Sequence, residues 1–147
     1  MELLVILTAI LLLVGSISVA LPSKSSRKIS KIRIEAKKLG FKITSTLYGK
    51  NSFKNKKSFN VFYQIKNSFN LKEGHFIRDK DELILYSPVK LKYSENFCSI
   101  KNELKGLTES VDEIIFTSSF ISFLWKESDG IEVLKAILEK LENLKNL

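Results

Sequence analysis

Cysteine and histidine, on which many binding sites and disulfide-rich folds depend, each occur once in this chain of 147 residues. A single cysteine, Cys98, excludes an intramolecular disulfide and any zinc site built from several cysteines. We expect Cys98 to be a buried or half-buried structural thiol. The lone histidine, His75, has no nearby cluster of metal-ligating residues in the sequence. We therefore predict that His75 is an ordinary strand residue.

Motifs of nucleotide-binding and hydrolytic enzymes are also missing. The chain has six glycines and contains no G-x-x-x-x-G-K-[ST], G-x-G-x-x-G or G-x-S-x-G pattern. The acidic run DKDE at residues 79–82 lacks the glycine and the distal glutamate of a calcium loop, so it is interpreted as a solvated turn. The sequence predicts a protein that is not an enzyme, with no catalytic residue, no metal ligand, no cofactor and no small-molecule substrate.

Acidic residues are scarce in the first part of the chain, although the whole carries 24 Lys and Arg against 16 Asp and Glu. Residues 25–39 predict a basic amphipathic helix with Gly40 as its C-terminal cap, because apolar residues recur every three or four positions. Near an anionic lipid leaflet each base of such a helix contributes on the order of 1 kcal/mol. The candidate lipid contacts are Arg27, Lys28, Lys31, Arg33, Lys37 and Lys38.

Two alternatives stay open for these bases. They could only fix membrane topology and solvate the helix, or the lysine excess could reflect the base composition of the genome. A nucleic-acid interface is less favoured, since the chain has no RNP-like aromatic motif and no basic helix-turn-helix pattern.

Residues 3–21 carry no charge and would rise about 28 Å as a helix, close to the ~30 Å of a bilayer core. This run predicts a single transmembrane helix. The bases that follow it predict a bacterial inner-membrane protein with its N-terminus outside and its C-terminal domain in the cytoplasm. The alternative is an exported protein whose signal peptide is cleaved after Ala20, although the leading Met-Glu lacks the positive start of a signal.

The rest of the chain alternates as strands do over residues 41–48, 59–66, 75–78 and 82–86, in a meander-like order. A helix is predicted over 97–107, and a hairpin of residues 111–117 and 120–125 turns at Ser118-Ser119, with its second strand central in the sheet. A last helix opens at Asp129, with Glu132 in capping-box position.

These elements predict an α+β fold: an N-terminal transmembrane helix, then a small antiparallel sheet of about four to six strands with helices packed on one side. The predicted parts are residues 1–22 as transmembrane anchor, 23–40 as basic juxtamembrane helix and 41–147 as α+β domain.

The segments LPSKSSRKISKIRIEAKKLGFKI and VDEIIFTSSFISFLWKESDGIEVLKAILEKL resemble the two ends of a group of small uncharacterised bacterial single-pass membrane proteins. That group combines an N-terminal anchor, an LPS-x-x-x-R start to a basic helix, and a terminal strand with tryptophan before a helix. The resemblance implies an anchored protein and no activity, so no functional residue follows from it.

The function expected from these observations is a membrane-anchored, non-enzymatic interaction or scaffold module with an unidentified protein partner. The alternatives are an exported envelope binding protein with a cleaved signal peptide and a membrane-associated nucleic-acid-binding protein.

Overall fold

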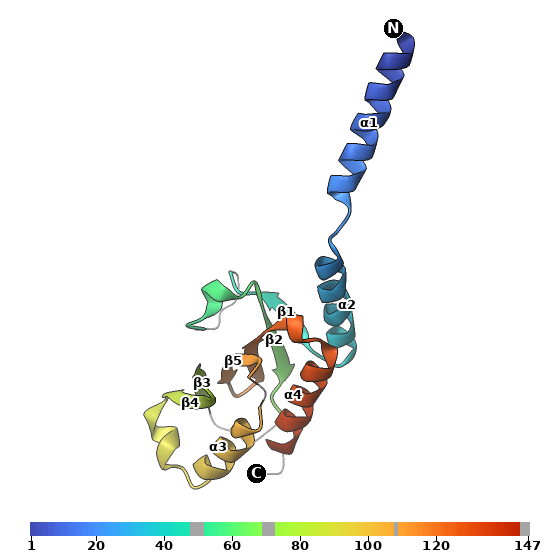
Figure 1. Ribbon diagram of the computed structural model, residues 1–147. Helices are drawn as coiled ribbons and strands as arrows, with labels where there is room; N and C mark the ends of the chain where they lie inside the picture. The colour runs from blue at the N-terminus through green and yellow to red at the C-terminus, as the bar shows by residue number, and fades with distance from the viewer. Residues whose placement is uncertain (48–51, 69–72, 108, 145–147) are drawn as a thin grey trace.

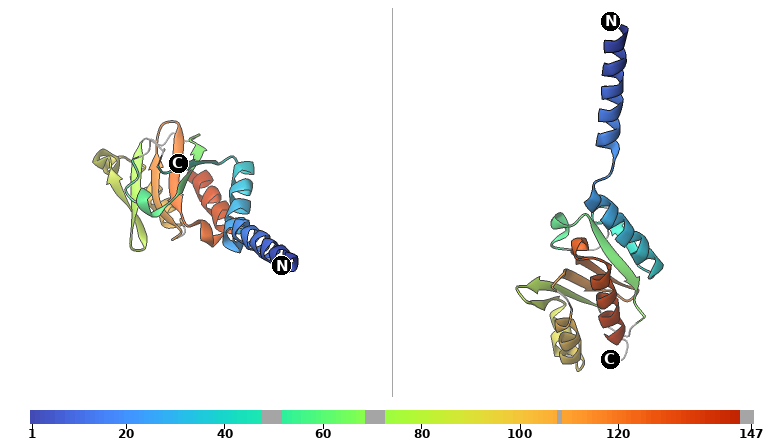
Figure 2. Two further views of the ribbon diagram at one scale, coloured as in Figure 1. Left: turned by 90° about the horizontal axis from the view of Figure 1, so that it is seen from above. Right: turned by 45° about the vertical axis from the view of Figure 1, so that its right-hand side comes forward.

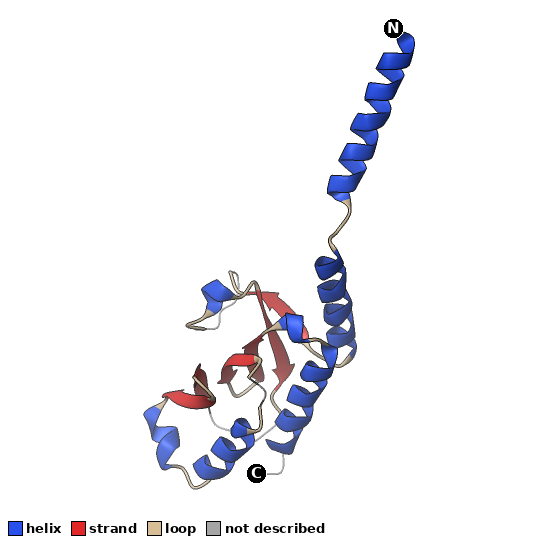
Figure 3. Ribbon diagram, viewed as in Figure 1, coloured by secondary structure: helices blue, strands red, loops and turns tan. Residues whose placement is uncertain are grey.

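The computed structural model describes residues 1–47, 52–68, 73–107 and 109–144 and has an α+β fold (Figures 1 and 3). The strands are β1 (Lys42–Ser45), β2 (Val61–Lys66), β3 (Gly74–Asp79), β4 (Glu82–Ser87), β5 (Val111–Phe116) and β6 (Phe120–Trp125). The helices are α1 (Glu2–Ala20), α2 (Lys24–Lys38), α3 (Phe97–Lys105) and α4 (Ile131–Asn143). The short 3₁₀ helices are η1 (Lys56–Ser58), η2 (Val89–Tyr93) and η3 (Glu127–Asp129).

The six strands form one antiparallel sheet in the order β1-β2-β6-β5-β3-β4. The prediction of a central strand at residues 120–125 is confirmed, because β6 lies between β2 and β5. The predicted meander is wrong at one connection: β3 pairs with β5, while β2 pairs with β6. The last hairpin therefore inserts between the first two strands and the β3–β4 hairpin.

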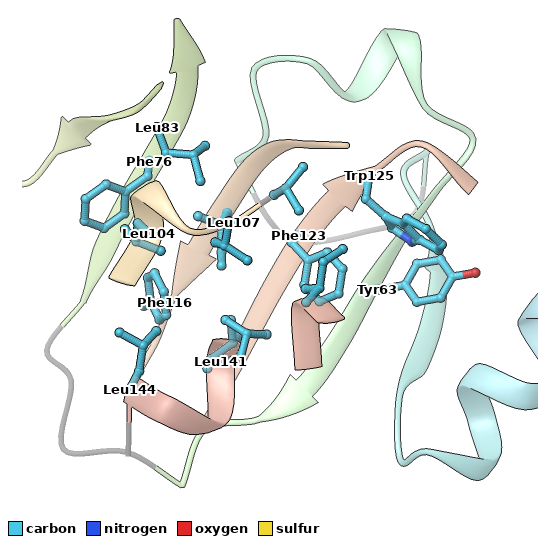
Figure 4. Close-up of a cluster of buried hydrophobic side chains, with 14 of the residues drawn as sticks. Tyr63, Phe76, Leu83, Leu104, Leu107, Phe116, Phe123, Trp125, Leu141 and Leu144 are labelled. Carbon is cyan, nitrogen blue, oxygen red and sulfur yellow. The ribbon is translucent and has the colours of Figure 1, made fainter. Parts of the chain in front are cut away.

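Helices α2, α3 and α4 contribute to a single apolar core on one face of the sheet. From α4, Leu134, Ile137 and Leu141 are at most 1 % exposed. Figure 4 shows how Phe116 and Phe123 of the sheet lie beside Leu141. Burial of each such side chain stabilises the fold by ~1.5–3 kcal/mol, so this face holds most of the stabilising apolar surface.

Helix α2 belongs to this packed body, because its Ile32 and Ala36 lie in the same core. Its C-terminal end has the hydrogen bonds of a Schellman motif: Gly40 N–H donates to Lys37 O at 3.1 Å, and Phe41 N–H donates to Ala36 O at 3.0 Å. Gly40 has φ +91°, which glycine adopts without the strain that a side chain brings. The predicted glycine terminator is confirmed, and it turns the chain directly into β1.

Helix α1 projects away from the rest of the protein in every view of Figures 1 and 2, and its described side chains are exposed. Over the part of the chain that the structure describes, no helix combines the length and apolar character needed to cross a membrane. The prediction of a transmembrane helix within residues 1–22 is therefore corrected, together with the single-pass membrane anchoring inferred from it. Helix α1 has 19 residues, starts at the acidic Glu2 and includes the polar Thr8, Ser16 and Ser18 among its apolar residues.

The opposite face of the sheet carries a smaller core, formed by Phe53, Phe62 and Leu124. Phe53 belongs to the segment of residues 52–60, which comes after β1 and before β2 in the chain. We call this segment the strap because it crosses this face of the sheet. Phe53 is 4 % exposed, and its ring centroid lies 5.3 Å from that of Phe62. The strap therefore covers part of the face that the helices leave open.

Candidate functional site

The six bases proposed as lipid contacts all lie on α2, but the structure separates them into two kinds. Five of them are exposed: Arg27, Lys28, Lys31, Lys37 and Lys38. Arg33 is instead half-buried and pairs with Glu127 in η3, where its Nε and Nη2 atoms donate to the two carboxylate oxygens at 2.7 and 2.8 Å. Arg33 thus links α2 to η3, which follows β6.

The same carboxylate also accepts a hydrogen bond of 2.7 Å from the hydroxyl of Tyr63 on β2. Burial and the hydrogen bond to Glu127 raise the pKa of Tyr63 far above its usual range, while the charge of Arg33 opposes this shift. Hydrogen bonding to Glu127 likewise raises the pKa of Arg33. The three side chains form a polar junction between α2, the sheet and η3, which is a structural role.

A second polar cluster lies on the face that the strap covers, where His75 of β3 meets Glu113 of β5. Their Nε2 and Oε1 atoms are 2.5 Å apart, and the Glu113 side chain is fully buried. Glu113 also accepts backbone hydrogen bonds from the strap, at 2.8 Å from Lys54 N–H and 2.9 Å from Asn55 N–H. A buried carboxylate is tolerated only with such partners.

The charge of Glu113 is favoured despite its burial. Desolvation alone would raise the pKa of Glu113, but hydrogen bonds from His75, Asn55 and Lys54 and the charge of His75 outweigh it, and the pKa is lowered. Glu113 ties the strap to the sheet, because it accepts hydrogen bonds from Lys54 and Asn55 of the strap and from His75 of β3.

The sequence did not predict the pairing of His75 with Glu113, because the two residues lie 38 positions apart in the chain. In the sheet, His75 faces Ile115 and Glu113 faces Ile77, so the pair is a diagonal neighbour on one face. One signal was present: Glu113 is an acid, next to Asp112, in the otherwise apolar strand segment VDEIIF. His75 is therefore a strand residue as predicted, but a buried and specifically paired one.

Beside this cluster, Tyr86 of β4 connects the strap to the edge of the sheet. Its ring lies edge-on to His75, with 5.0 Å between the centroids, and the ammonium of Lys54 lies 5.0 Å from the Tyr86 centroid. A cavity of about 400 Å³ opens next to His75, lined in part by Ser52, Ser87 and Thr117. In the described ranges, no three His, Cys, Asp or Glu side chains are grouped so that they could hold a metal ion.

A second cavity, lined mostly by apolar residues, lies on the other side of β4, between this strand, η2 and α3. We call it the β4 groove; it has a volume of about 330 Å³. Its lining residues are Phe76, Leu83, Ile84, Leu85, Val89, Lys92, Phe97 and Lys101. The groove follows the free edge of the sheet, since β4 is the last strand in the sheet order.

Exposed apolar side chains surround the β4 groove. Ile84 is 45 % exposed, Tyr86 50 % and Val89 66 %. Helix α1 also exposes apolar side chains, but they surround the helix on all sides and define no single face. The β4 groove, in contrast, is an exposed apolar surface with a defined shape.

Two further predictions concern residues near this surface. Cys98 lies on α3, as expected, but it is exposed, which corrects the expectation of a buried or half-buried thiol. In the β3–β4 turn, Asp79 and Asp81 are exposed as the solvated-turn interpretation requires, and Glu82 pairs with Lys101 and Lys105.

Comparison of this chain with protein-family models, with curated proteins and with solved structures finds no match.

Proposed function

We propose that the protein is a non-enzymatic interaction module that binds an extended segment of a partner protein along strand β4. The observation that carries the proposal is the combination of a free sheet edge with apolar surface on both of its sides. Leu85 and Val89 line the β4 groove on one side, while Ile84 and Tyr86 are exposed along the strand.

The two edges of the sheet differ in a way that supports β4 as the binding edge. Natural proteins protect edge strands by making them short or by placing charges along them. Strand β1 has four residues and starts with Lys42, whereas β4 has six and carries no charge after Glu82. Among the described strands, β4 is thus the edge with the least protection against an added strand.

An added strand would use the general mode of β-augmentation. Its backbone N–H and C=O groups pair with those of β4, and its side chains alternate between the two faces. Side chains on one face would enter the β4 groove, and those on the other would cover the exposed side chain of Tyr86. Backbone pairing supplies affinity and the groove supplies specificity.

The test is selection of a phage-displayed library of random twelve-residue peptides on the full chain. The variant is Ile84→Lys, and the matched control is Phe120→Lys, because Ile84 and Phe120 are 45 % and 42 % exposed. We expect enriched peptides with alternating apolar residues that lose binding to the Ile84 variant and keep it with the control. Enrichment of no peptide, or of peptides that bind both variants equally, would refute the proposal.

A further inference from the structure

We infer that the segment bound at β4 is acidic at both of its ends, so that the partner is an apolar strand flanked by Asp or Glu. This inference rests on the proposed function and adds the chemistry of the partner. It follows from the charges that line and border the β4 groove.

Both charged residues that line the groove are lysines, and they come from different elements. Lys92 belongs to η2, which follows the end of β4, and Lys101 belongs to α3. The other described lining residues are apolar. A segment lying in the groove therefore meets a cation from each of these two elements and no lining anion.

Glu82 shows which kind of group these cations accept. Its carboxylate lies 3.2 Å from the ammonium of Lys105 and 3.8 Å from that of Lys101, at the start of β4. Two lysines thus share one carboxylate at the start of β4. These side chains are 44–51 % exposed, so they can turn toward a second carboxylate.

The acidic residues near the start of β4 do not line the groove. Asp79 and Asp81 lie in the turn that precedes β4, and Glu82 already pairs with the two lysines of α3. At the other end, Lys90 and Lys92 are exposed on η2. The charged side chains that line the groove, Lys92 and Lys101, therefore favour a partner with negative ends over one with positive ends.

Exposed ion pairs are screened, so the expected effect is moderate and depends on salt. One such pair changes affinity by roughly two- to five-fold, and the attraction weakens at high ionic strength. An acidic partner makes two attractive contacts with the lysines, and a basic partner makes two repulsive ones. Together these predict that the acidic partner binds about ten-fold more tightly than the basic partner at low salt.

The experiment measures fluorescence anisotropy of two labelled peptides with the full chain. Both contain the core Ile-Thr-Val-Thr-Ile; one is flanked by two glutamates at each end and the other by two lysines. The acid-flanked peptide should bind about ten-fold more tightly at 20 mM salt, and this preference should shrink at 0.5 M salt. The double variant Lys92→Glu, Lys101→Glu should reverse the preference, while Lys57→Glu, Lys66→Glu, which changes exposed lysines outside the groove, should leave it unchanged.

The outcomes separate the two proposals. Equal binding of both peptides, lost with Ile84→Lys, would overturn the acidic partner and leave the interaction module standing. Binding of neither peptide, together with an empty library selection, would overturn both. A dimer would also overturn both proposals, if light scattering gives twice the mass of one chain and the second copy covers β4.

Discussion

Replacement of Glu113 by alanine should strongly destabilise the protein, because it leaves several buried donors without an acceptor. Glu113 accepts from His75 and from the backbone N–H groups of Lys54 and Asn55, and its side chain is fully buried. Removal of one partner of a buried pair typically costs about 3–5 kcal/mol. In a chain of this size that corresponds to a fall in Tm of about 10 °C.

The assay is urea unfolding followed by the fluorescence of Trp125, which is the only tryptophan and is 2 % exposed. Glu113→Gln should cost less, about 1–3 kcal/mol, since the amide keeps an oxygen that can accept one of the strap N–H groups. Glu82→Gln is the control, because the Glu82 side chain is 45 % exposed and its ion pairs lie at the surface, so this variant should cost less than about 1 kcal/mol.

A double-variant cycle with His75→Ala tests whether the two side chains act as a pair. The double variant should be little less stable than Glu113→Ala alone. A loss of less than about 1 kcal/mol for Glu113→Ala would refute the tie between the strap and the sheet, and full additivity with His75→Ala would refute the pairing of the two side chains.

The stabilisation by Glu113 should also depend on pH in a defined direction. Its pKa is lowered in the folded state, so the unfolded chain takes up a proton first as the pH falls. The contribution is complete above the ordinary value of 4.5 and is lost as the pH falls below it through the folded-state value. The stability difference between wild type and Glu113→Gln should therefore shrink in acid.

Three other outcomes can be checked directly. In an alkaline titration followed at 295 nm, one of the four tyrosines should stay protonated beyond the usual range, and Tyr63→Phe should remove it, because burial and Glu127 raise the pKa of Tyr63. Gly40→Ala should cost about 1 kcal/mol and Gly40→Asn less, since φ is +91° with no atom within 4 Å of a Cβ there. Exposed Cys98 should react with a thiol reagent in the native protein at one equivalent per chain. Reaction only after the protein is unfolded would contradict the exposure of Cys98.

Local patterns in the sequence were enough for most of the elements. Alternation located β1 and β2, and the turn residues between β3 and β4 and between β5 and β6 lie where expected. These features depend on neighbours within a few residues, which the sequence displays. The order of the strands depends on distant pairing and was not predictable in the same way.

The start of α4 shows how a distant partner overrides a local signal. The sequence favours Asp129 as N-cap with Glu132 in a capping box, but the N-cap is Gly130 at φ +97° and Asp129 ends η3. The Asp129 carboxylate accepts a hydrogen bond from the Ser110 hydroxyl instead. Ser110 precedes β5, and only the folded sheet brings it there.

The candidate site was the least predictable part. The β4 groove combines residues of β3, β4, η2 and α3, and its apolar members look like core residues in the sequence. Exposure of Ile84 and Val89 follows from the position of β4 at the edge, which depends on the pairing of β3 with β5. The lysines were visible as charge, but not their place beside an apolar cavity.

Hydrogen–deuterium exchange of the full chain with and without the acid-flanked peptide tests the central claim most directly. If a partner strand pairs with β4, backbone amides of Glu82–Ser87 should exchange more slowly with the peptide present, while those of the other edge strand, Lys42–Ser45, should not change. Unchanged exchange in β4, or equal protection of β1 and β4, would contradict the account.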